Sequence, residues 1–277
     1  MNNKPKPQWE RLLHEALTTP GILSDCYSQF HRFSFLNQIE AWSQCVMRGI
    51  QPGPIACYKA WQAKGRQVRK GEQAIRLWMP INRTVKETKQ EGTREFEVTR
   101  WWTEFRYLPR WFVLAQTEGE PLEPEPIPEW DLSRALAELN VSLVPYSEIN
   151  GNCQGYAFRR SIAVNPLAAN PHKTRFHELA HVVLGHTDRD ALMVDSRELT
   201  RDIAELEAEA VALICAESLG LAGAAESRGY IQHWYSGSEV PSESAKRIFA
   251  AADKILKAGE VAKVEQAVQR QVLDLAA

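Results

Sequence analysis

Apolar residues recur at helical spacing in two stretches near the beginning of the chain. The first stretch spans residues 9–17 and the second spans residues 35–46. Side chains three or four positions apart lie on one face of a helix, so each stretch predicts a helix with one buried face.

The pattern changes after residue 54. The run IACYKAWQ opens a unit that ends in QAIRLWMPI, where polar residues interposed between apolar ones indicate a strand that Pro80 should close. Residues 82–100 are polar, charged and interrupted by glycine, which favours a hairpin or an insertion. RWFVLAQ then resumes strand character.

Prolines and acids dominate the stretch TEGEPLEPEPIPEWD, residues 117–131. Repeated prolines disfavour helix in the residues before them and produce an extended, semi-rigid connector. We therefore expect three parts: a domain at residues 1–120, a Pro/Glu-rich linker at 121–131 and a second domain at 132–277.

Helices dominate the pattern after the connector. LSRALAELN predicts a helix, and QGYAFRRSIAVNP predicts either a strand pair or one long edge strand. Asn170 and Pro171 are typical of a helix start, and Gly185 is typical of its end. A further helix is expected from about Ser196 to Ser218, and another in PSESAKRIFAAADKILKAG, with one face on the core.

Composition is typical of a folded protein, because 44% of the 277 residues are hydrophobic and 25% are charged. Apolar stretches fall far short of the ~20 residues that a membrane span needs, and MNNKPKPQWE does not resemble a signal peptide. We therefore expect a cytoplasmic protein that does not contact membranes. The five cysteines are scattered and form no Cys-x-x-Cys pair, so they are expected to be reduced.

The segment RFHELAHVVLGH, residues 175–186, contains His-Glu-x-x-His. On a helix, His177 and His181 lie on one face with Cβ atoms about 5 to 6 Å apart, so both imidazoles can bind one ion. Glu178 projects about 100° around the helix, where its carboxylate can take a proton from metal-bound water. Zinc suits such ligands, and a catalytic zinc site requires a third protein ligand.

The acidic helix RDIAELEAEAVALICAESLG offers that third ligand. Glu205 and Glu209 share one face, whereas Glu207 lies about 200° from Glu205. We expect Glu205 to bind the metal and Glu209 to orient an imidazole, although the opposite assignment of these two residues stays open. The ion is expected to be Zn²⁺, with Mn²⁺ or Co²⁺ as alternatives.

These residues predict hydrolysis of a peptide bond. Zinc lowers the pKa of bound water to about 7, Glu178 accepts the proton, and the hydroxide attacks a polarised carbonyl. Tyr156, Tyr230 and His233 are candidates for contacting the substrate or stabilising the oxyanion. The strand predicted in QGYAFRRSIAVNP could pair with an extended substrate, or it could be a plain edge strand.

The competing interpretation is an ordinary helix with histidines at its C-terminal end, where the helix dipole favours cations, beside an Ala/Glu-rich helix that forms well. His186 follows Gly185 and is expected to be a cap or surface residue rather than a fourth ligand.

Basic and aromatic residues interleave in CYKAWQAKGRQVRKGEQAIRLW. Aromatic rings stack on unpaired bases and cations follow phosphates, so the run suits single-stranded nucleic acid, although such aromatics also occur in cores. Gly65 and Gly71 would let the backbone turn tightly around the cations.

Several of these segments resemble the ArdC-type antirestriction family of plasmids and other mobile elements. In the first half, the resemblance lies in SFLNQIEAW, ACYKAWQAKGRQVRKGEQAIRLWMP and FVLAQTEG. In the second half it lies in FHELAHVVLGH, ELEAEAVA, RGYIQHW and the AADKILKAG helix. The resemblance implies an α+β protein with an N-terminal single-stranded DNA-binding domain and a C-terminal zincin-like metallopeptidase domain.

The resemblance makes DNA binding the favoured hypothesis and implies a role in protecting incoming DNA from host restriction. It is also consistent with a glutamate ligand followed by another acid four residues later. The residues expected to bind the strand are Asn37, Tyr58, Lys59, Trp61, Arg66, Arg69, Lys70 and Arg76.

Three functions stay open from the sequence. The first is a DNA-bound zinc peptidase that cleaves a protein substrate, with a host restriction enzyme as a further candidate partner. The second is a DNA-binding protector whose metal is structural, and the third is a peptidase that cleaves a repressor without binding DNA.

Overall fold

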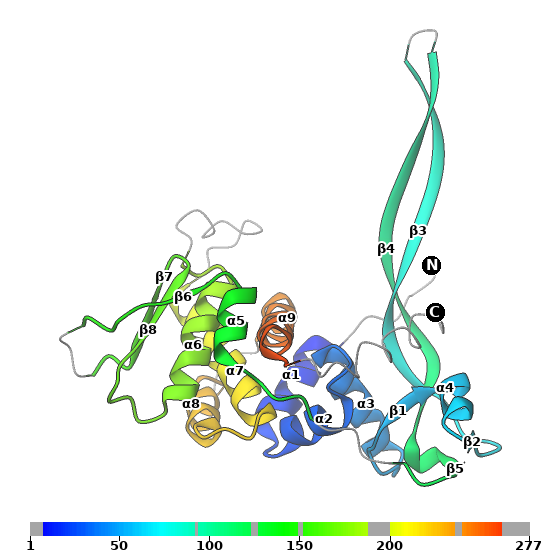
Figure 1. Cartoon of the computed structure of the whole chain (residues 1–277), viewed down its shortest axis with the longest axis horizontal. Helices are drawn as coiled ribbons and strands as arrows, with labels where there is room; N and C mark the ends of the chain where they lie inside the picture. Colours follow the sequence, from blue (N-terminus) through cyan, green and yellow to red (C-terminus); the bar gives the residue numbers. More distant parts are fainter. Residues whose placement is uncertain are drawn as a thin grey trace. The chain divides into compact units, whose positions relative to one another are not determined.

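The computed structural model describes residues 8–91, 94–122, 127–148, 152–187, 200–235 and 240–261, without the side chains of residues 87–96 and 232–235. It divides the chain into two compact units (Figure 1). The hairpin unit comprises Met1–Pro5 and Ser43–Leu122, and the helical unit comprises Lys6–Trp42 and Glu123–Ala277. The predicted α+β class is confirmed.

The observed division differs from the expected one at the N-terminal end of the chain. The boundary at Leu122 lies at the start of the predicted linker, but residues 6–42 belong to the helical unit. Here the helices α1 (Trp9–Thr18) and α2 (Ile22–Phe30) pack against later helices of that unit. The apolar face predicted in residues 9–17 is buried, and the second predicted helix is α3 (Phe35–Met47).

The hairpin unit contains two small antiparallel sheets. In one, β1 (Ile55–Cys57) pairs with β4 (Arg94–Val113), which pairs with β3 (Ile75–Glu91). In the other, β2 (Arg66–Val68) pairs with β5 (Thr117–Gly119). The helix α4 (Tyr58–Ala63) follows β1 directly, and a 3-10 turn, Leu114–Gln116, joins β4 to β5.

The strands β3 and β4 form a long twisted two-stranded ribbon (Figure 1). The hairpin predicted at residues 82–100 is therefore confirmed, but the expectation that Pro80 ends the first strand is wrong. Pro80 lies within β3, opposite Phe105. A two-stranded ribbon has only edge strands, and an edge position can lack a backbone N–H donor without breaking the ladder.

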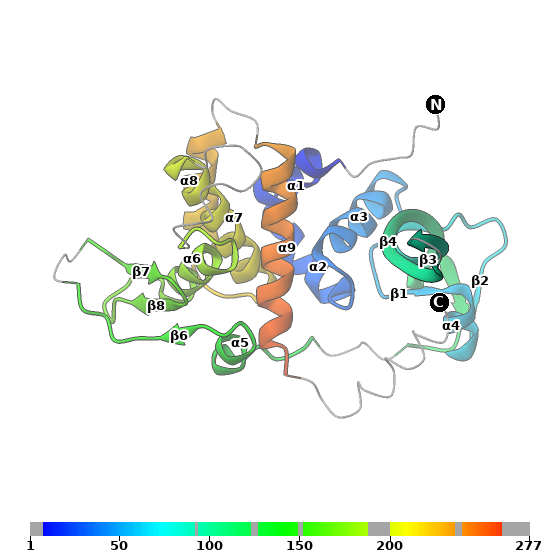
Figure 2. The same ribbon diagram turned by 90° about the horizontal axis from the view of Figure 1, so that it is seen from above.

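The helical unit is organised around α7 (Arg201–Ser218), in which nearly every residue from Glu207 onward is buried. It packs against α6 (Pro171–Val183), α8 (Ala224–Tyr235), α9 (Ser242–Gly259) and α2 (Figure 2). The short helix α5 (Leu132–Glu138) packs on α9. The helices predicted from LSRALAELN, RFHELAHVVL and PSESAKRIFAAADKILKAG are confirmed.

A buried ion pair ties the first helices to the later ones. The Glu217 carboxylate on α7 accepts a hydrogen bond from the Gly21 backbone N–H at 2.8 Å and pairs with Arg228 on α8. Arg228 also donates to the Leu17 carbonyl at the end of α1. Because charged partners in a buried network are costly to separate, these bonds fix the beginning of the chain within the helical unit.

One small sheet lies beside α6. Its strand order is β6 (Ser142–Leu143), β8 (Ser161–Val164) and β7 (Gly155–Phe158), with β6 parallel and β7 antiparallel to β8. QGYAFRRSIAVNP therefore forms a strand pair, and β7 is its edge strand. Both strands contact α6, which carries the histidine motif (Figure 2).

Candidate functional site

The helix α6 presents His177 and His181 on one face. It begins after Asn170 with Pro171 in its first turn, and it ends before Gly185, which has a positive φ of 80°. These are the helix signals expected from the sequence. Glu178 and both histidines line a cleft of about 590 Å³, whose opposite wall includes Gly155, Tyr156 and Ala157 of β7.

Three donor atoms from α6 and α7 converge in this cleft. The Nε2 atoms of His177 and His181 are 3.1 Å apart, and Glu205 Oε2 lies 3.3 Å from the first and 3.7 Å from the second. Ligand atoms about 2.0 to 2.1 Å from a tetrahedral zinc ion are separated by roughly 3.3 Å. The donor set and its spacing therefore fit one small divalent cation.

Glu209 holds His177 from the other side of the imidazole ring. Its Oε2 atom lies 3.0 Å from His177 Nδ1, and its Oε1 atom lies 2.7 Å from Lys173 Nζ. A carboxylate only accepts, so Nδ1 carries the proton and donates, and Nε2 faces the cluster. Glu205 therefore lies beside the two Nε2 atoms and Glu209 lies behind the ring of His177, which are the positions that the expected assignment of these two residues requires.

These contacts shift the pKa values of the cluster. Burial alone would lower the pKa of His177, but hydrogen bonds to Glu205 and Glu209 outweigh it and raise this pKa to about 9. Hydrogen bonds from both histidines lower the pKa of Glu205. Burial alone would raise the pKa of Glu209, but bonds from His177 and Lys173 lower it to about 2. These shifts favour a positively charged His177 between the two carboxylates.

Glu178 occupies a different environment in the same cleft. Its side chain is buried, and this burial raises its pKa against the opposing effect of the two histidines. The backbone of β7 approaches it closely because residue 155 is glycine. A Cβ atom there would lie 2.7 Å from Thr174 Cγ2, 2.9 Å from the Ala163 carbonyl oxygen and 3.2 Å from Glu178 Cγ.

His186 differs from its expected surface position. Its backbone N–H caps α6 at the His181 carbonyl, but its side chain is buried. His186 Nδ1 lies 3.0 Å from His181 Nδ1, and His186 Nε2 lies 3.1 Å from Glu207 Oε2. Arg247 on α9 pairs with the same Glu207 oxygen at 3.3 Å. A chain of polar contacts thus runs from His181 to α9.

The remaining candidate residues differ in where they lie relative to the cleft. Tyr156 lines the cleft, and its hydroxyl lies 3.1 Å from Ser147 Oγ. Tyr230 is an exposed residue of α8 and is not among the residues lining the cleft, while the side chain of His233 lies outside the described residues. Arg201, at the start of α7, lines the cleft and was not expected from the sequence.

Two residues expected to bind a nucleic acid strand are buried. Trp61 is only 1% exposed, lies in the core with Ala56 and Val68, and donates its Nε1–H to the Phe112 carbonyl at 2.8 Å. Asn37 is also buried and belongs to the helical unit. The expectation that these two side chains contact a nucleic acid is therefore corrected, because neither has a surface to offer.

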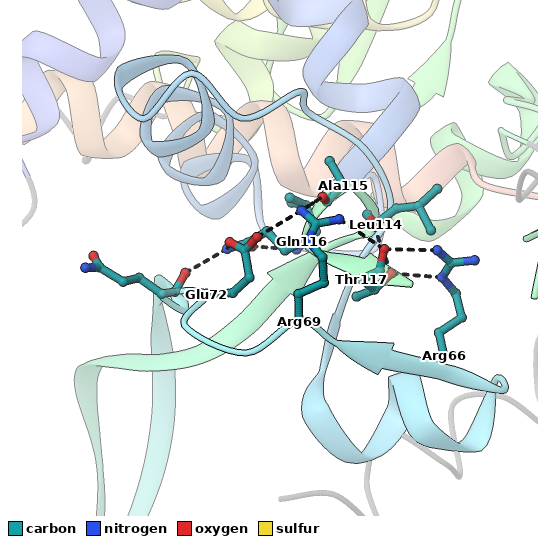
Figure 3. Close-up of polar contacts among 9 residues, drawn as sticks. Arg66, Arg69, Glu72, Leu114, Ala115, Gln116 and Thr117 are labelled. Atoms are coloured by element: carbon teal, nitrogen blue, oxygen red, sulfur yellow. Dashed lines mark hydrogen bonds and ion pairs between the residues drawn. The ribbon is translucent and has the colours of Figure 1, made fainter. Parts of the chain in front are cut away.

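The two arginines of GRQVRKGE bond to their own chain (Figure 3). Arg66 donates to Thr117 Oγ1 at 2.8 Å and to the carbonyls of Thr117 and Gly119. Arg69 donates to the Ala115 carbonyl and pairs with Glu72 at 2.9 Å. Carbonyl partners fix the planar guanidinium groups, so both arginines primarily hold the segment from Ala115 to Gly119 in place.

The other predicted strand contacts lie on the surface of the hairpin unit. Tyr58 is 42% exposed, and its hydroxyl accepts a hydrogen bond from Gln67. The side chains of Lys59, Lys70 and Arg76 are exposed. The structure therefore keeps these four residues accessible, and their contact with nucleic acid stays a prediction.

Mixed helices and strands with three metal-type ligands beside an edge strand define an α+β protein with a candidate metal centre. Residues 4–107 match the family model of the N-terminal domain of anti-restriction factor ArdC.

Two crystal structures of the antirestriction ArdC protein from the R388 plasmid are similar to this chain. The metal-free structure is 18% identical with a TM-score of 0.46, over 91% of this chain and 95% of that chain. The Mn(II)-bound structure is 19% identical with a TM-score of 0.47, over 90% and 96%. None of the curated proteins matches this chain. Among the helices described here, none is long and apolar enough to cross a bilayer.

Proposed function

We propose that this chain is an antirestriction protein of the ArdC type, which binds single-stranded DNA through its hairpin unit and carries a zinc peptidase-type site in its helical unit. The observation that carries the enzymatic proposal is the convergence of His177, His181 and Glu205 in one cleft, beside the buried Glu178. A cluster that only braced two helices would not need an additional carboxylate with a raised pKa in the same cleft.

The proposed ligands are the Nε2 atoms of His177 and His181 together with the Glu205 carboxylate. A divalent cation bound there would supply a Lewis acid that polarises a carbonyl and acidifies water. The nitrogen-rich donor set favours zinc, and Mn²⁺ and Co²⁺ are the competing ions.

Each remaining group of the cleft has a role in this proposal. Glu178 takes a proton from water and later returns it to the leaving amine, and its raised pKa suits both steps. The edge strand β7 binds an extended peptide by backbone pairing, which places the scissile bond over the cleft. The Tyr156 hydroxyl at the cleft wall is available to stabilise charge on the carbonyl oxygen.

The decisive variant is Glu178→Gln, assayed for proteolysis and for protection of DNA against restriction. Loss of a general base costs about 10² to 10⁴ in rate, whereas the proposed ligands are unchanged and metal content should persist. The matched control is Arg201→Gln, which changes the cleft wall outside the proposed ligands. It should lose less proteolytic activity than Glu178→Gln.

Equal proteolysis by wild type and Glu178→Gln would exclude the hydrolytic role. If Glu178→Gln loses proteolysis but still protects DNA against restriction, the metal has a structural role. Protection then results from coverage of the DNA by the protein. The polar contacts that already join α6, α7 and α9 favour that second function, since a metal would add one more link between α6 and α7.

A further inference from the structure

The register of the β3–β4 ribbon sorts its side chains onto two faces. Directly opposed residues share a face, and alternate residues along a strand switch faces. We define the arm as Trp78–Lys86 of β3 and Glu97–Arg110 of β4. The first face of the arm, called the aromatic face here, contains Trp78, Trp101, Phe105 and Tyr107.

Contacts across the strands agree with this division. Trp78 and Tyr107 stack at a centroid distance of 4.9 Å, and Thr103 and Asn82 hydrogen-bond beside them on the aromatic face. On the other face, Arg83 pairs with Glu104 at 3.3 Å. The aromatic face therefore carries four of the five aromatic rings of the arm, whereas the other face carries Trp102 and the charged residues Arg83, Arg100, Glu104 and Arg106.

Two rings of the aromatic face are largely exposed to solvent and do not pack into a core. Trp101 is 79% exposed and Phe105 is 62% exposed. Large aromatic side chains gain much by burial, so two of them presented on one ribbon indicate a surface that binds a partner. Along a strand, side chains on one face are spaced by about 6.6 to 6.8 Å, so Trp101 and Phe105, which are two such steps apart, are separated by about 13 Å and can contact separate planar groups.

The charge of the arm indicates the class of partner. Of its described charged residues, five are basic and two are acidic, whereas the whole chain has a net charge of −2. The basic residues of the arm are Arg83, Lys86, Arg100, Arg106 and Arg110. Three of these five lie on β4, and β1 pairs with β4 only at residues 111–113. By the alternation of β4, Arg100 and Arg106 lie on the face opposite to the rings, so the same strand presents aromatic side chains on one face and cations on the other.

Rings on one face of a narrow ribbon, with arginines on its other face, suit an unpaired polynucleotide. Its bases can stack on the rings, and its phosphates can follow the arginines. A duplex hides its bases inside the stack, so it would leave the exposed rings without their partner. Trp61, Arg66 and Arg69 already serve the fold of the hairpin unit, so their side chains are engaged within the chain.

We propose that the aromatic face of the arm is the stacking surface for single-stranded DNA, with its phosphates contacted by the arginines of β4. This inference rests on the proposed function and identifies where the strand binds. Trp101 and Phe105 stack on bases, and Arg106 and Arg110 contact the backbone.

The test measures binding of a fluorescently labelled 20-nucleotide oligo(dT) to the full-length protein by anisotropy, over a series of salt concentrations. The central variant is Trp101→Ala with Phe105→Ala, which should weaken binding at least tenfold. Trp101→Phe keeps a ring and should bind within about threefold of wild type. Arg106→Gln should weaken binding and reduce the slope of log K against log salt by about one.

Two matched controls separate this surface from general effects. Trp102→Ala removes a 47% exposed ring from the opposite face of the same strand, and Leu167→Ala removes an 89% exposed side chain from the helical unit. Both should bind within about twofold of wild type. Circular dichroism and thermal melting of each variant establish that the fold is intact.

The outcomes distinguish this inference from the proposed function. If wild type does not bind oligo(dT), the DNA-binding part of the proposed function fails, and this inference fails with it. If wild type binds and the double variant binds equally well, only the inference is overturned. Equal losses for Trp101→Ala and Trp102→Ala would also overturn it, as would tighter binding of a 20-base-pair duplex than of the single strand.

Discussion

The histidine cluster of the helical unit and the GRQVRKGE segment of the hairpin unit use polar residues in opposite ways. In the cluster, His177, His181 and Glu205 direct atoms toward one shared point. In the other segment, Arg66 and Arg69 direct their donors at backbone carbonyls of the same chain. Polar residues in a motif can therefore build a ligand site or build the fold, and the direction in which their donors point decides between the two.

The comparison is tested most strongly by charge reversal at the two arginines. Arg66→Glu with Arg69→Glu should destabilise the hairpin unit by about 3 to 5 kcal/mol, because several charge-assisted hydrogen bonds are lost and carbonyls face a carboxylate. Urea denaturation followed by circular dichroism measures this. Lys59→Glu with Lys70→Glu is the control with the same charge change at exposed positions, and it should cost less than about 1 kcal/mol. Equal stability of both double variants would contradict a structural role for the arginines.

The histidine cluster predicts a steep pH dependence of metal binding. The pKa of His177 is raised to about 9, so a cation must displace a proton at neutral pH. Raising the pH from 6.5 to 8.5 should therefore tighten binding by on the order of a hundredfold. Competition of the metal against a chromophoric chelator measures this change.

Glu209→Gln provides the control for that pH dependence. It replaces the negative charge that helps to raise the pKa of His177 with a neutral amide, so its affinity should level off at a lower pH than in wild type. An affinity that does not change across this pH range would show that no proton competes with the metal.

His186 tests whether the polar chain behind His181 orients that ligand. His186→Leu should weaken metal affinity about 10- to 100-fold, because the second nitrogen of His181 loses its partner. His186→Gln can accept from His181 and donate to Glu207, so it should restore most of the affinity. Thermal melting of the metal-free variants shows whether a loss of affinity results from a less stable fold rather than from a misoriented His181. Equal metal affinities of His186→Leu and His186→Gln would argue against the orienting role.

The smallest expected effect is at the close approach of β7 to α6. Gly155→Ala should destabilise the helical unit by about 1 to 2 kcal/mol, since its Cβ would contact the Ala163 carbonyl and Thr174. Gly229→Ala, at a helical position where a Cβ would contact nothing within 4 Å, is the matched control. A stability of Gly155→Ala equal to that of wild type would show that β7 can move away from α6.

The parts of the site that depend on local geometry could be predicted from the sequence. The spacing of His177, His181 and Glu178 on one helix, and of Glu205 and Glu209 on another, follows from 3.6 residues per turn. The chain of contacts from His186 to Glu207 and Arg247 could not be predicted, because it joins three helices that are distant in sequence. The structural role of Arg66 and Arg69 could not be predicted either, because their partners lie about fifty residues downstream in the sequence.

The fold could be predicted where one face of an element is buried. The sequence predicted α1, α3, α5, α6, α7 and α9, whereas α2, α4, α8 and the short strands β2, β5 and β6 were not expected. The extent of β3 and β4 was also missed. A two-stranded ribbon exposes both faces, so its sequence can be polar and charged throughout and lacks the alternation that marks a half-buried strand.

The discontinuous composition of the helical unit constrains how the protein is made. Its first helices leave the ribosome before the intervening residues Ser43–Leu122 and long before α7, α8 and α9. Glu217 and Arg228, the partners that fix Gly21 and Leu17, are absent until most of the chain is translated. The apolar faces of α1 and α2 therefore stay exposed during synthesis. Co-translational folding of the helical unit is complete only after α9, its last helix, has been synthesised.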